Sequence, residues 1–263
     1  MISTNLFSDS ESRKLVAKKN NFSVIEYERD ISIDPAYAEI AYFASKMNVR
    51  KRQLVVELTD DMGLNVQAGM MQMLIGDIDT STGIKGAGDL LKKAVSSVVT
   101  NESIVKPFYQ GNGLLVLEPT FKFIILEDLD DWPDGMIIED KMYLASEESV
   151  KLSLATRRTL SSAILGGEGL INTLLIGTGM VALESSVPQG ELIEVELEDD
   201  VLKVDGNMAI AWSPNLRFTV QKTTSTLVGS AVSGEGFVNV YEGTGKVLIA
   251  PVRNNPRISV PEK

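Results

Sequence analysis

The sequence predicts an all-β protein built from three tandem sheet repeats, with one or two short helices. Three observations carry this prediction: a glycine signature that recurs along the chain, apolar residues at every second position, and frequent turn residues. Short strands separated by turns favour a sandwich or barrel over a parallel βαβ sheet.

The repeat is visible as matching segments. Gly-Glu-Gly-Leu-Ile-Asn at 167–172 returns as Gly-Glu-Gly-Phe-Val-Asn at 234–239, and Gly-Thr-Gly at 177–179 returns at 243–245. Three units, of which the third is shortened, therefore fit into residues 53–253. We expect tight turns at the glycines of these signatures, which are Gly167, Gly169, Gly177, Gly179, Gly234, Gly236, Gly243 and Gly245.

Within a unit the apolar residues alternate with polar ones. Ile193, Val195 and Leu197 alternate with glutamates, and the apolar residues of 216–220 follow the same period. A period of two predicts strands with one dry and one wet face. Pro-Gln-Gly at 188–190 predicts a reversal between such strands.

Two segments predict helices. Asp34 followed by Pro35 is typical of a helix start, and apolar residues then follow at helical spacing up to Met47. We expect this helix to precede the β body. Residues 89–99 predict a second, amphipathic helix after a glycine-rich approach.

The expected organisation has three parts. Residues 1–52 form an N-terminal extension that carries the short helix and packs on the body, without being an independent domain. Residues 53–253 form the triple-repeat β domain, and residues 254–263 form a C-terminal tail.

The composition excludes several kinds of chemistry. The 263 residues include no cysteine and no histidine. Disulfides, zinc–cysteine sites, thiol catalysis and the Ser-His-Asp triad are therefore excluded. Catalysis by carboxylates, lysine or a Ser-Lys pair stays open.

The charge argues against a nucleic-acid partner. The formal net charge is -11, although residues 1–52 contain nine Lys/Arg and seven Asp/Glu. The remaining 16 basic and 29 acidic residues give a balance of -13, which repels a phosphate backbone. No apolar span of 18 residues and no leader pattern is found, so we expect a cytoplasmic protein.

The densest acidic cluster is the weak candidate for a cation site. Asp128, Asp130 and Asp131 lie between Glu127 and Asp134. An EF-hand loop that starts at Asp128 needs an oxygen ligand at its fifth position and a glycine at its sixth, but Trp132 and Pro133 stand there. We therefore interpret the cluster as a solvated acidic turn and expect no metal.

Three further motifs do not support a site. The glycine-rich segment 83–88 lacks the Gly-Lys-Ser/Thr ending of a phosphate loop. The Gly-Thr-Gly elements lack the third glycine of a dinucleotide fingerprint. Ser103 and Lys106 have Ser-x-x-Lys spacing without its partner motifs. We therefore expect no catalytic residue and no cofactor.

The ordered set of signatures resembles the altered-inheritance-of-mitochondria family. The likeness rests on Gly-Asp-Ile at 76–78, Gly-Glu-Gly-Leu at 167–170, Lys-Val-Asp-Gly at 203–206, and the two elements at 234–237 and 243–247. This resemblance implies a fold grouped with the tryptophan RNA-binding attenuator protein, with β-sandwich units around a pseudo-threefold axis. It implies no enzyme activity, and kinship in fold is not evidence of RNA binding.

The leading hypothesis is a non-catalytic β-repeat protein that acts through protein contacts and forms a homo-oligomer. The first alternative is a module that holds a small ligand or a cation. An enzyme using carboxylates, lysine or serine, and attachment to a membrane surface through residues 84–99, are the remaining alternatives.

Overall fold

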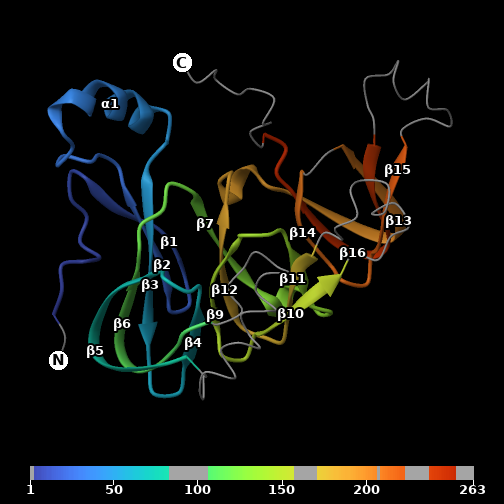
Figure 1. The fold of residues 1–263 in the computed structure, drawn as a ribbon, viewed down its shortest axis with the longest axis horizontal. Coiled ribbons are helices and arrows are strands. Elements are labelled where there is room, and N and C mark those ends of the chain that lie inside the picture. Colours follow the sequence, from blue (N-terminus) through green and yellow to red (C-terminus); the bar gives the residue numbers. More distant parts are fainter. Residues whose placement is uncertain (1–2, 83–105, 157–170, 206–207, 223–236, 253–263) are drawn as a thin grey trace, which may run out of the picture. The chain divides into compact units, whose positions relative to one another are not determined.

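The computed structural model describes residues 3–82, 106–156, 171–205, 208–222 and 237–252. Strands dominate, which confirms the all-β prediction, and they form two antiparallel sheets (Figure 1). The sheets belong to two compact units. The chain passes between these units repeatedly, because each unit is assembled from three separate segments.

The first unit comprises Met1–Asp128, Met142–Val150 and Gly179–Ser185. Its strands follow the hydrogen-bonded order β1-β2-β3-β6-β4-β9-β12-β7, and β5 pairs with β6. Their bounds are β1 Arg13–Lys19, β2 Phe22–Tyr27, β3 Lys51–Leu58, β4 Gly63–Val66, β5 Met71–Ser81, β6 Phe108–Leu117, β7 Phe123–Asp128, β9 Tyr143–Glu147 and β12 Met180–Ser185.

The second unit comprises Leu129–Lys141, Lys151–Thr178 and Ser186–Lys263. Its strand order is β10-β11-β8-β14-β16-β13, and β15 pairs with β16. The bounds are β8 Met136–Ile138, β10 Lys151–Thr156, β11 Ile171–Ile176, β13 Ile193–Asp205, β14 Ala209–Trp212, β15 Arg217–Lys222 and β16 Phe237–Ile249; the 3-10 turns are η2 Leu129–Asp131 and η3 Gln189–Glu191.

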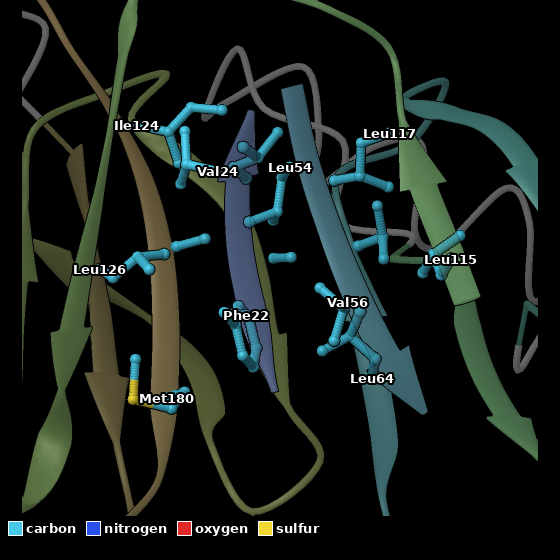
Figure 2. Packing of buried hydrophobic residues seen from close by; sticks show 14 of the residues in the cluster. Phe22, Val24, Leu54, Val56, Leu64, Leu115, Leu117, Ile124, Leu126 and Met180 are labelled. Carbon is cyan, nitrogen blue, oxygen red and sulfur yellow. The ribbon is translucent and has the colours of Figure 1, made fainter. Parts of the chain in front are cut away.

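The core of the first unit forms because its sheet curls. β7 stands at the far end of the strand order, yet Ile124 and Leu126 of β7 pack in one cluster with Phe22 of β2 and Leu54 of β3. Figure 2 shows these side chains pointing toward one another from their separate strands. Phe22 and Leu54 are fully buried. The second unit has its own core, in which Trp212 packs with Tyr241 at a ring-centroid distance of 5.6 Å.

One helix lies in the described part of the chain, between β2 and β3 (Figure 1). Asp34 caps the 3-10 turn η1 (Pro35–Tyr37), because its Oδ1 accepts a 2.8 Å hydrogen bond from the Ala36 N–H. Helix α1 (Ala38–Lys46) follows directly. The predicted helix start is therefore confirmed, but the helix does not precede the β body, since β1 and β2 come before it. The second predicted helix, 89–99, lies outside the described residues.

The repeat glycines take a form that the sequence did not predict. Gly243 and Gly245 do not form a tight turn, since both lie within β16 with φ of 124° and 157°. They pair with Asp200 and Leu197 of β13, and the register shifts between these two partners. The element is therefore a bulged step within a continuous ladder.

The glycines of the other Gly-Thr-Gly element behave differently, because they lie between two strands. Gly177 and Gly179 flank the bend between β11 and β12, where the chain passes from the second unit to the first. Residues 167, 169, 234 and 236 lie outside the described part. The predicted boundary at residue 52 does not coincide with an edge of either unit, because β2 pairs with β3 along its whole length.

Candidate functional site

Helix α1 leaves its apolar side chains in solvent. None of its residues is buried, and Ile40, Phe43 and Met47 are 70%, 59% and 78% exposed. Other large apolar residues around the helix are also mostly exposed. We call the whole set the α1 surface; it consists of Ile31, Tyr37, Ile40, Tyr42, Phe43, Met47, Val49 and Phe121.

An apolar groove of about 760 Å³ runs along one side of α1. Tyr37, Ala41 and Ala44 line it from the helix side, while Ile31 and Phe121 line it from neighbouring loops. Its polar lining consists of Ser12, Glu28, Arg29, Asp30, Ser32, Ser45, Arg50 and Lys51. An amphipathic surface helix normally buries its apolar stripe, so both the helix and the groove lack their expected cover.

Polar contacts attach α1 and the turn after it to the rest of the first unit. Ser45 donates a short hydrogen bond from its hydroxyl to the Glu28 carbonyl oxygen. Arg50 Nε donates to the Ser45 carbonyl oxygen at 3.0 Å, which places a cation at the negative end of the helix. Arg52 Nη2 donates to Asn48 Oδ1 at 2.8 Å just past the helix end. The helix is therefore held in place without burying its apolar residues.

A buried ion cluster beneath the helix supports these contacts. Glu26 accepts from Arg50 at 2.6 Å and from Arg52 at 2.7 Å, one arginine to each carboxylate oxygen. The Arg52 guanidinium also lies 3.8 Å from the centre of the Phe123 ring. Burial lowers the pKa of Arg52 from its ordinary value, and the Glu26 carboxylate opposes that shift.

The rim of the groove carries paired charges of both signs. Lys51 Nζ lies 3.0 Å from Asp30 Oδ2, and Lys14 Nζ lies 2.9 Å from Glu28 Oε1. The hydrogen bonds from these lysines hold the pKa of the Asp30 and Glu28 carboxyl groups below their ordinary values. The rim therefore offers neither a strong positive nor a strong negative field.

The predicted acidic cluster falls at the end of β7 and in η2. Asp128 ends β7, and Asp130 and Asp131 belong to η2. Among the residues that the structure describes, no group of three or more Asp or Glu side chains could hold a metal ion. Asp134 instead accepts a 3.0 Å hydrogen bond from Asn215. The glycine-rich segment 83–88 and Ser103 lie outside the described residues.

Sequence reasoning missed the α1 surface. It recognised the apolar residues of one helix face but gave no meaning to Tyr42, Phe43 and Val49. The available signal was that α1 has only Glu39 and Lys46 as charged residues, so that no broad polar face exists. A helix of that kind is expected to be enclosed, and here it is not.

The fold defines an all-β protein with two antiparallel sheets and an exposed apolar helix. The chain belongs to the family described as Mitochondrial biogenesis AIM24, whose family model matches residues 46–252. The match begins at the last residue of α1, so β1, β2 and nearly all of α1 precede it.

A similar fold occurs in a solved bacterial structure. The X-ray crystal structure of a Streptococcus pyogenes protein from a structural genomics consortium aligns with a TM-score of 0.56 over 92% of this chain and 94% of that chain. The identity is 19%, so the likeness concerns the fold alone. None of the curated proteins compared with the chain matches it significantly. Among the described residues, no helix combines the length and the apolar character needed to cross a membrane.

Proposed function

We propose that this protein is non-catalytic and acts by binding protein partners through the α1 surface. The observation that carries the proposal is that α1 buries none of its residues while eight large apolar side chains around it stay exposed. Exposed apolar patches of this size mark interaction sites in soluble proteins, because leaving them in water is unfavourable.

The chemistry of the helix favours a protein partner over a bilayer. A helix that lies on a membrane has a broad charged face rich in Lys and Arg. Helix α1 carries one basic residue, Lys46, and one acidic residue, Glu39. The paired charges at the groove rim add no attraction for anionic lipid headgroups.

A non-catalytic role agrees with the side chains present. The chain has no histidine or cysteine to act as base or nucleophile near neutral pH. The perturbed groups in the groove, Glu28 and Asp30, owe their lowered pKa to lysine partners at the surface. Such shifts are those of structural ion pairs, and they keep both carboxylates ionised.

We also propose that the three sequence units have the same strand arrangement around a pseudo-threefold axis, as the resemblance to the attenuator-protein fold implies. Backbone conformation supports this: Gly111 and Gly113 in β6 have φ of 131° and 158°, close to the values at Gly243 and Gly245 in β16. In both strands the Gly-x-Gly element lies within a long ladder and does not end it, although only the β13–β16 ladder shifts its register there.

Photo-crosslinking in cells tests the proposed function. A benzophenone amino acid replaces Phe43 in the α1 surface or, as a matched control, Leu154, an exposed apolar residue of β10. We expect a protein adduct from position 43 that disappears when Ile40→Ser is added, and no such adduct from position 154. Equal labelling from both positions, or adducts with lipid alone, would contradict the proposal.

A small apolar ligand is the second candidate. The groove of about 760 Å³ lies within the range of ligand pockets, roughly 300–1,000 Å³. Native mass spectrometry of the purified protein distinguishes the two. The Ala41→Trp variant is designed to fill the groove. A stoichiometric extra mass that is present in the wild type and lost in this variant supports a bound ligand. A wild-type protein without any extra mass supports a protein partner.

A further inference from the structure

We infer that the α1 surface binds the α1 surface of a second copy of this chain, with the two helices antiparallel about a two-fold axis. The inference rests on the proposed function, since it names the protein partner of the same surface. It is carried by the charge pattern of α1, by the position of its apolar stripe, and by the apolar area available.

The two charged residues of α1 are placed for antiparallel pairing. Glu39 and Lys46 are seven residues apart, so they lie on one side of the helix, two turns from each other. In the described part of the chain neither makes an ion pair; Lys46 only stacks 5.3 Å from the centre of the Tyr42 ring. If the second helix is antiparallel, Glu39 of each copy lies beside Lys46 of the other, so two ion pairs form. If the second helix is parallel, like charges lie beside each other.

The apolar stripe lies between this charged side and the groove. Ile40, Phe43 and Met47 follow the i, i+3, i+7 spacing, and Phe43 stands midway between Glu39 and Lys46. A two-fold axis that pairs the charges therefore passes close to Phe43. On the other flank the groove sides of both helices adjoin, so that the apolar contact continues through Tyr37 and Ala41. Such a self-complementary patch is what an isologous interface requires.

The area is sufficient for a stable dimer. The eight side chains of the α1 surface are between 52% and 78% exposed. With roughly 150–250 Å² for each aromatic side chain and less for the Ile, Met and Val side chains, they present on the order of 800 Å² of surface. A standard interface buries about 800 Å² on each partner.

The charge of the whole chain leaves few other places where two copies can meet. The net charge is -11, but residues 1–52 contain nine basic and seven acidic residues. Repulsion between two copies is therefore smallest where their N-terminal segments, including α1, face each other.

Cysteine crosslinking tests the arrangement, and the chain is suited to it because it has no native cysteine. Glu39→Cys and Lys46→Cys are prepared as separate proteins and treated with a bis-maleimide whose reach is about the 8–10 Å spacing of packed helices. Like positions in an antiparallel pair are offset by about 10 Å along the helix axis, whereas position 39 faces position 46 of the other copy. Val201→Cys, on exposed β13, is the control.

We expect the 1:1 mixture of Glu39→Cys and Lys46→Cys to yield at least about fivefold more crosslinked dimer than either protein alone or the control, given that difference in spacing. Equal yields from the mixture and the separate proteins, or yields no higher than that of Val201→Cys, would overturn the inference. If in-cell photo-crosslinking at position 43 still gives an Ile40-dependent protein adduct, the proposed function stands. Only the inference that the partner is a second copy of this chain is then rejected. If both experiments are negative, the proposed function and the inferred dimer are both rejected.

Discussion

Arg52 and Glu26 face each other across β3 and β2, with Arg52 Nη2 2.7 Å from Glu26 Oε2 in the interior of the first unit. The same arginine holds Asn48 at the end of α1 and stacks on Phe123 of β7. One buried cation thus connects the helix, the middle of the sheet and its far strand. The turn at the end of the exposed helix is therefore held by an arginine that is itself buried in the first unit.

Replacing Arg52 should destabilise the protein strongly. Arg52→Met removes one partner of a buried pair, and we expect a loss of about 3 kcal/mol in the free energy of unfolding. Arg217→Met breaks the exposed pair with Glu242 and should change it by less than about 1 kcal/mol. Denaturant titrations of both variants check this. A loss at Arg52 no larger than that at Arg217 would show that the buried cluster is not structural.

Gly111 of β6 should not tolerate a side chain. A Cβ at Gly111 would lie 2.2 Å from the Asp77 carbonyl oxygen of β5, and its φ of 131° is strained for an L-residue. We expect Gly111→Ala to lower stability by at least about 2 kcal/mol. Gly190→Ala, with nothing within 4 Å of its Cβ, is the matched control and should be near neutral. Similar midpoints for the two variants would contradict the close approach of β5 to Gly111.

The alternation predicted the strands, and in β13 it also predicted burial at the residues where the strand is covered. Leu197 is buried and Val195 is half-buried, whereas Ile193, expected on the same dry face, is 49% exposed at the start of the strand. The sequence could not predict that Gly243 and Gly245 continue a strand, because the same residues are equally typical of turns. It placed α1 from Asp34 and Pro35, but local spacing does not say whether a helix is covered by the rest of the chain.

The two units should unfold together. Each is assembled from three separate segments, so neither can close without ordering the chain of the other. Both tryptophans, Trp132 and Trp212, belong to the second unit, whereas Leu54 is in the core of the first. We expect Leu54→Ala to cost about 3 kcal/mol and to shift the tryptophan fluorescence and circular dichroism transitions equally.

The control for this experiment is Leu154→Ala, an exposed site that should change stability by less than about 0.5 kcal/mol. A fluorescence transition that stays at its original midpoint in Leu54→Ala would show that the second unit unfolds alone.

The groove rim should lose its ion pairs in acid. Because the pKa of Glu28 and Asp30 is lowered in the folded protein, their pairs stabilise it above the ordinary carboxyl pKa of about 4 and are lost as the pH falls through the lowered values. Carboxyl NMR shifts followed from about pH 6 to 2 should show this. Lys51→Met should move the Asp30 midpoint upward and leave Glu28 nearly unchanged; an Asp30 midpoint that does not respond would exclude the pair.

The most direct test of the α1 surface as a self-binding site is sedimentation velocity of the purified chain. We expect the wild type to sediment as a dimer, with twice the chain mass of 28.6 kDa, and Phe43→Ser/Met47→Ser to sediment as a monomer. Leu15→Ser/Val16→Ser, which changes exposed apolar residues of β1, should remain dimeric. A monomeric wild type, or a Phe43→Ser/Met47→Ser variant that stays dimeric while folded, would contradict the account.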